Sequence, residues 1–132
     1  MLLDSETPVA EIERTWEHLR QQDGWEKPES AGDDHVLLMV TCTESWIVAD
    51  RATLESHYGS TLQQSALPPV NDLESRDRES VQNALTHATR RCSNAYAKGK
   101  RSFELIGELD PAVLTGQLPS FARMERVLNE RL

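Results

Sequence analysis

The chain has 132 residues, of which 38% are hydrophobic and 27% charged, and its formal net charge is -8. This length and composition suit one folded domain over residues 1–132 and exclude an intrinsically disordered chain. The N-terminus has neither a basic start nor a long apolar run, so the sequence predicts no secretory signal and no membrane span, and we expect a cytoplasmic, bacterial protein.

The first third of the chain is predicted to form a helix, a loop and two strands. Apolar residues recur at helical spacing over residues 7–24, between a capping threonine and a glycine. The Pro-, Ser- and acid-rich loop over 25–34 contains Trp25, which we expect to fold back on the core. The apolar runs 36–40 and 46–49 predict an antiparallel hairpin whose first strand is buried on both faces.

The middle of the chain is predicted to be helical. Asp50 is expected to cap a short helix over 51–58, which Gly59 ends. A surface loop over 60–72 then leads to the longest predicted element, a helix from 73 to 98 with a buried stripe of small and apolar residues.

The last third is predicted to contain a strand and two helices. Residues 102–109 alternate in polarity, which indicates a strand with one face in water. Short helical segments begin at 110–111 and at 119–120, where a proline stands near the first turn. Together the elements predict an α+β fold, with a small antiparallel sheet of about three strands packed by the long helix and flanked by N- and C-terminal helices.

One stretch resembles a family of short uncharacterised bacterial proteins that share a strand pair, a small helix ending in an aromatic residue and glycine, and a longer helix. The resemblance covers residues 40–109. It is carried by the run from Asp50 to Glu55, by His57, Tyr58 and Gly59, and by Arg78. It implies the same α+β layout and assigns no chemistry.

Acidic residues are concentrated in the first half of the chain. Residues 1–66 carry 13 acidic and 4 basic side chains, whereas residues 67–132 carry 9 and 10. A negative surface favours docking on a basic protein surface, as small acidic inhibitors, immunity proteins and anti-defence proteins do. We therefore expect a non-catalytic interaction protein. Its predicted contact residues are Glu11, Glu13, Glu17, Asp33 and Asp34.

Basic residues cluster at the end of the long predicted helix. They are Arg90, Arg91, Lys98, Lys100 and Arg101. The helix dipole alone favours cations at that end, and phosphate contact is the alternative interpretation. The net negative charge argues against a nucleic acid partner.

Catalytic, metal and cofactor motifs are weak throughout the sequence. The histidines show no zinc spacing and the glycines do not cluster into a phosphate-binding loop, so no metal and no cofactor is predicted. Cys42 and Cys92 fall at core positions and are expected to be buried thiols rather than a disulfide. Two alternatives to docking stay open. One is a homodimeric structural or regulatory module that uses the terminal helix over 121–132, and the other is a small hydrolase or transferase that uses His57 or His87.

Overall fold

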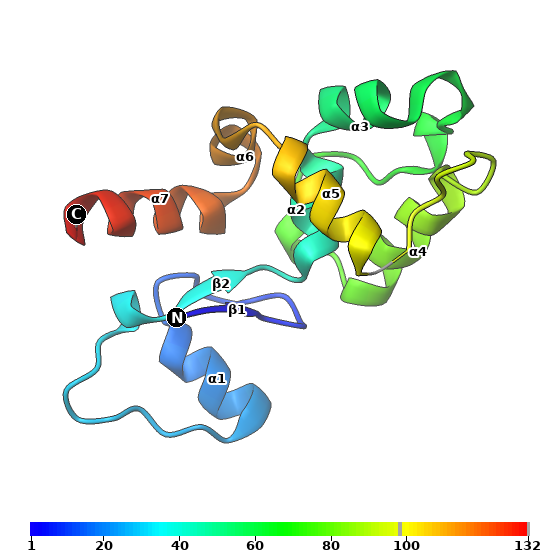
Figure 1. Ribbon diagram of the computed structural model, residues 1–132. Helices are drawn as coiled ribbons and strands as arrows, with labels where there is room; N and C mark the ends of the chain where they lie inside the picture. Colours follow the sequence, from blue (N-terminus) through cyan, green and yellow to red (C-terminus); the bar gives the residue numbers. More distant parts are fainter. Residues whose placement is uncertain (98, 132) are drawn as a thin grey trace.

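Two hydrophobic clusters organise the chain in the computed structural model, which describes residues 1–97 and 99–131. The smaller cluster gathers Leu19, Val36, Leu38 and Val40. It forms the core of what we call the N-terminal lobe, residues 1–40. The larger cluster is built by the helices that follow, which we call the helical body, residues 41–131. Figure 1 shows the two parts side by side, with the last helix lying along the strands.

The N-terminal lobe contains a two-stranded sheet and one helix. Strands β1 (Leu2–Asp4) and β2 (Leu37–Met39) run parallel. Helix α1 (Thr15–Asp23) and the short 3-10 helix η1 (Asp33–His35) lie in the connection between them. Because parallel strands cannot be joined by a tight turn, a crossover of this kind is required. Helix α1 ends at Gly24, whose φ of 70° is readily reached by a residue without a Cβ atom.

Helix α2 (Thr43–Ala49) occupies the centre of the helical body, and every residue from Glu44 to Ala49 is buried. Three of the helices that pack against it lie between residues 51 and 108. These are α3 (Arg51–Tyr58), α4 (Arg78–Ala88) and α5 (Lys100–Glu108). The loop between α3 and α4 contains three 3-10 turns. They are η2 (Gly59–Thr61), η3 (Gln64–Ala66) and η4 (Leu73–Ser75).

The chain ends in two consecutive helices, α6 (Pro111–Gln117) and α7 (Pro119–Arg131). The starts predicted for both helices are confirmed, as are the cap at Asp50 and the end of α3 at Gly59. Helix α7 packs on β2, so the last part of the chain contacts the first (Figure 1).

The predicted antiparallel sheet of three strands is wrong. The described residues contain one two-stranded parallel sheet, and residues 46–49 belong to helix α2. A short apolar run has the same pattern in a strand covered on both faces and in a helix covered all round. Neighbouring helices pack around residues 46–49, and this environment favours the helical conformation.

Three other predicted elements also differ from the structure. Residues 102–109 lie mostly in α5, where Ser102 and Leu105 are buried one turn apart while Phe103 remains 74% exposed. The predicted helix from 73 to 98 is interrupted, because Asp77 caps α4 and the chain turns after Thr89. The predicted helix over 7–24 shortens to α1, and strand β1 was not predicted.

Candidate partner-binding site

The five acids predicted to contact a partner all lie in the N-terminal lobe. They come from the segment before α1, from α1 itself and from η1. Asp33 Oδ1 accepts a hydrogen bond from Trp16 N at 3.1 Å, which fixes η1 beside α1.

Two of these acids pair with arginines of their own segment. Arg14 Nε lies 3.0 Å from Glu11 Oε2, and Arg14 Nη1 lies 3.9 Å from Glu17 Oε2. Arg20 Nη2 is 3.6 Å from Glu17 Oε1. All four side chains are exposed, so these ion pairs are weak and leave Glu11 and Glu17 able to exchange partners.

Two others pair with arginines of α7. Glu13 Oε2 lies 3.2 Å from Arg123 Nε, and Glu13 Oε1 lies 2.6 Å from Arg126 Nη2. Asp34 pairs with Arg131. The hydrogen bond from Arg126 lowers the pKa of Glu13, and the one from Arg131 lowers the pKa of Asp34. These two acids therefore attach α7 to the N-terminal lobe.

The predicted basic cluster is divided between two elements. Arg90 and Arg91 follow the end of α4 and are exposed, and Arg90 Nη1 donates to His87 O at 2.8 Å. Arg101 stands in the first turn of α5, where its Nη1 lies 3.5 Å from Glu104 Oε2. Lys100 begins α5, and Lys98 lies outside the described residues. Phosphate contact by this set stays a prediction.

The histidines and cysteines named for a hydrolase or transferase are dispersed. His57 Nδ1 lies 2.8 Å from Glu108 Oε2, and His87 is exposed on the last turn of α4. Cys42 and Cys92 are both buried free thiols, as predicted. None of these two histidines and two cysteines lines either hollow described below.

A pocket of about 470 Å³ lies between β1 and the end of α1. Its acidic side chains are Asp4, Glu6 and Asp23, and its apolar side chains include Leu2, Leu19 and Trp25. We call it the acid-rimmed pocket. Among the residues that the structure describes, no lysine, arginine or histidine lines it. It is a hollow with negative edges and an apolar wall.

Local backbone geometry places the residues of this pocket. Glu6 has a left-handed backbone with φ of 66°, and its N–H donates to Thr41 O at 2.8 Å. That conformation costs about 1 kcal/mol or more for a residue with a Cβ atom, and the hydrogen bond helps to offset it. On the opposite side, the turn at Gly24 brings Trp25 back toward the helix, with Trp25 N donating to Leu19 O at 3.4 Å.

Two large apolar side chains of the pocket remain in contact with water. Leu2 is 48% exposed and Trp25 is 44% exposed. The expectation that Trp25 folds back on the core is therefore wrong. Tryptophan is one of the residue types that often contribute most of the binding energy at protein–protein interfaces.

The three carboxylates suit a cationic side chain better than a metal ion. Within residues 1–97 and 99–131, no three His, Cys, Asp or Glu side chains are close enough to hold a metal. A lysine or arginine side chain has an apolar stem and a charged end, so it can use both the apolar wall and the acidic edge. Glu6 also has an internal partner, since Arg78 Nη1 lies 3.7 Å from its Oε1 with both side chains half exposed.

The sequence pattern did not identify this pocket. Its residues come from β1, which is too short to show a strand period, and from a loop whose tryptophan was expected to be buried. The one available signal was Leu2 and Leu3 followed by Asp4, an apolar pair at the start of an acidic segment.

A family profile described as "Domain of unknown function (DUF4276)" matches residues 1–129. The chain belongs to the DUF4276 family. The DUF4276 match spans almost the whole chain, whereas the resemblance predicted from the sequence covered residues 40–109. The two agree in pointing to an uncharacterised family. No curated protein and no solved structure is significantly similar to this DUF4276 chain. Every helix in its described part is too short or too polar to cross a membrane.

Proposed function

We propose that the protein is a small acidic interaction protein without catalytic activity, which docks on a basic surface of a partner protein through the acid-rimmed pocket. In this proposal it acts in the bacterial cytoplasm. The observation that carries the proposal is the pocket's composition, with three carboxylates and an exposed tryptophan and leucine, and no basic residue lining its described part. Charge complementarity at such a site raises the encounter rate and disfavours acidic partners.

The position of the pocket narrows the interface predicted from the sequence. Glu13 and Asp34 are occupied by arginines of α7, while Glu11 and Glu17 are exposed beside arginines of their own segment. A basic partner in the pocket would meet Asp4, Glu6 and Asp23, which are all exposed. Contact with Glu17 on α1 and with Glu11 before it would extend the interface.

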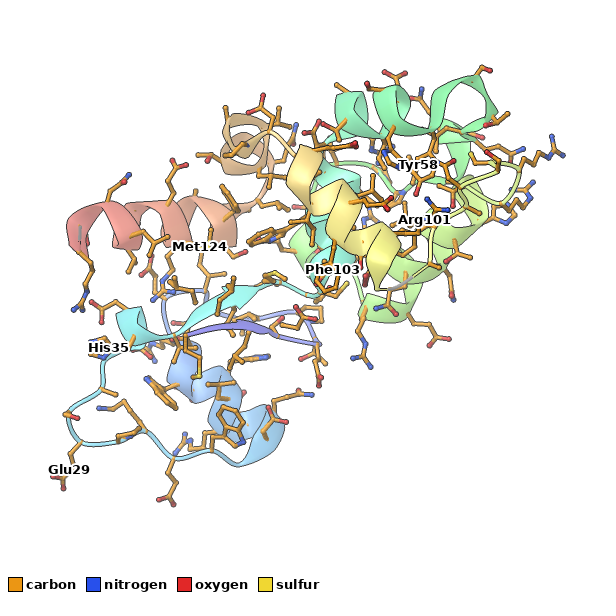
Figure 2. All side chains as sticks on the ribbon, viewed as in Figure 1. Glu29, His35, Tyr58, Arg101, Phe103 and Met124 are labelled. Carbon is orange, nitrogen blue, oxygen red and sulfur yellow. The ribbon has the colours of Figure 1, made fainter. Side chains whose placement is uncertain are left out.

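A charge reversal with a matched control tests the proposal. The probe is a peptide of alternating lysine and leucine, and its Kd is measured by calorimetry for the wild-type protein and two variants. Asp23→Lys places a positive charge in the pocket and should weaken binding about tenfold. Glu29→Lys makes the same charge change in the loop that follows α1, at a position that does not line the pocket, and it should leave the Kd close to the wild-type value. Figure 2 shows Glu29 at the outer turn of that loop.

Salt and peptide charge provide the second arm of the experiment. The Kd of the lysine peptide should increase as salt is raised, because exposed charges are screened. A peptide of alternating glutamate and leucine should not bind. Equal weakening by Asp23→Lys and Glu29→Lys, or equal binding of the two peptides, would contradict docking in the acid-rimmed pocket.

A further inference from the structure

A second hollow lies between the N-terminal lobe and the helical body, at a different place from the acid-rimmed pocket. Its volume is about 660 Å³, within the range of small-molecule sites. We call it the interlobe groove. One wall is formed by Val9, Ile12 and Val40 of the N-terminal lobe, and the other by residues 70–75 and the junction between α6 and α7.

The groove combines apolar walls with acidic groups. Val70, Leu73 and Pro119 continue the apolar lining on the side of the helical body, while Asp72 and Glu74 supply carboxylates. Among the described residues, no lysine, arginine or histidine lines the groove. A ligand with an apolar part and a positive charge matches this lining, because its apolar part can contact Val9, Ile12 and Val70 while its charge lies near Asp72, and an anion would be repelled.

The two acids have different roles in this arrangement. Glu74 Oε1 and Oε2 each lie 3.1 Å from Ser120 N, and Glu74 also accepts a hydrogen bond from Ser120 Oγ, so its carboxylate is engaged at the start of α7. Burial raises the pKa of Glu74, and the bonds from Ser120 offset part of that effect. Asp72 is exposed at the edge of the groove, in a left-handed conformation with φ of 57°.

We infer that the interlobe groove binds a small molecule with a protonated amine on an apolar body, the amine at Asp72 and the apolar part between Ile12 and Leu73. This site is independent of the proposed docking function, because it uses a different hollow. Two different carboxylates make its acidic part. The expected class of ligand is an amphiphilic amine.

The probe is hexylamine, with hexan-1-ol and hexanoate as probes of the same chain length and different charge. Amide resonances are followed by two-dimensional NMR during titration of each probe at millimolar concentration. Hexylamine should shift the resonances of residues 70–75 and 116–118. Hexan-1-ol should shift them less, and hexanoate should leave them unchanged.

Two glycines of the helical body provide a blocking variant and its control. A Cβ atom built on Gly116, which lines the groove, or on Gly107, which does not, meets no atom within 4 Å. Gly116→Phe should fill the groove and abolish the hexylamine shifts, whereas Gly107→Phe should retain them. Asp72→Asn keeps a residue that tolerates the left-handed conformation and should weaken hexylamine binding several-fold.

The outcomes separate clearly. Loss of binding in Gly116→Phe and weakening in Asp72→Asn, with Gly107→Phe unchanged, would support the site. Absence of hexylamine shifts in the wild-type protein, equal binding of hexanoate, or retained binding in folded Gly116→Phe would overturn it. Because Asp72→Asn changes only an exposed side chain, it provides a folded test even if Gly116→Phe is unstable. The charge reversal of Asp23 should not alter hexylamine binding, so failure here leaves the docking proposal standing.

Discussion

Glu44 is a carboxylate buried in the centre of the helical body, with a relative exposure of 1%. Its Oε2 accepts a hydrogen bond from Tyr96 Oη at 2.7 Å, and its Oε1 accepts one from Gln82 Nε2 at 2.8 Å. Tyr96 N in turn donates to Thr89 Oγ1 at 2.9 Å. A buried carboxylate is costly unless it is hydrogen-bonded, so these contacts hold the segment after α4 against α2.

The substitution Tyr96→Phe removes one of two hydrogen-bond donors to Glu44 in the described part of the chain, and it should lower the free energy of unfolding by about 1–3 kcal/mol. Tyr58→Phe is the matched control, because the Tyr58 hydroxyl is buried and has no hydrogen-bond partner in the described part of the chain. Deleting that hydroxyl should be neutral or stabilising. Urea unfolding at neutral pH measures both variants, and equal losses would show that the hydrogen bond to Glu44 contributes little.

At the scale of elements, Asp50 joins two helices that are distant in sequence. Its carboxylate accepts from Thr53 N at 3.2 Å and from Thr53 Oγ1 at 2.8 Å at the start of α3. It also accepts from Asp110 N at 2.9 Å, just before α6. Burial works to raise the pKa of Asp50, but these hydrogen bonds outweigh burial and hold the pKa below its ordinary value.

The lowered pKa of Asp50 gives a pH-dependent stability. Because the folded-state pKa lies below that of the unfolded chain, the ionised carboxylate stabilises the fold above pH of about 4, and this stabilisation is lost as the pH falls through the folded-state value. Asp50→Asn should therefore cost about 1–2 kcal/mol at neutral pH and less at pH of about 3. Unfolding by urea at several pH values measures the difference, and a loss that does not change with pH would contradict this role.

The sequence predicted the helix ends better than the sheet. Asp50, Gly59 and Asp110 with its following proline act through local backbone chemistry, so their positions could be predicted without tertiary structure. The run Trp46 to Ala49 could not be assigned in that way, because its buried environment is created by α4, α5 and α6. Strand β1 is three residues long, and it pairs with a strand 35 positions later.

The position of the acid-rimmed pocket could not be predicted from the sequence. The negative charge of the first half is visible in composition, whereas the arginines that neutralise Glu13 and Asp34 come from α7, about a hundred residues away in sequence. No sequence spacing predicts that these acids and arginines pair. Tertiary structure is needed to separate acids that bind arginine within the chain from acids that line a pocket.

At the scale of the whole molecule, α7 attaches the N-terminal lobe to the helical body. Arg123 has a relative exposure of 4%, and it donates to Val36 O at 3.2 Å, to Asp33 O at 2.9 Å and to Glu13 Oε2 at 3.2 Å. Figure 2 shows α7, which carries Met124, beside the strands and near His35. The guanidinium group is the side-chain donor to the Val36 carbonyl, and it adds a hydrogen bond to the Asp33 carbonyl, which Thr15 Oγ1 and Val36 N also reach.

Arg123→Met should lower the free energy of unfolding by about 1–3 kcal/mol, because it removes the donor to Val36 O and one of three donors to Asp33 O, while keeping most of the buried volume. Arg126→Met is the control, since Arg126 is exposed and pairs with Glu13 alone among the described acids; it should leave stability nearly unchanged. Chemical unfolding compares the two. A smaller loss for Arg123→Met than for Arg126→Met would contradict the attachment of the lobes through Arg123.

Amide shift mapping with the lysine–leucine peptide would locate the residues at which a basic partner binds. We predict that the perturbed resonances are confined to residues 2–6 and 19–25, which include the lining of the acid-rimmed pocket. Shifts centred on residues 33–34 and the C-terminal half of α7, or shifts spread evenly over the surface, would contradict the account.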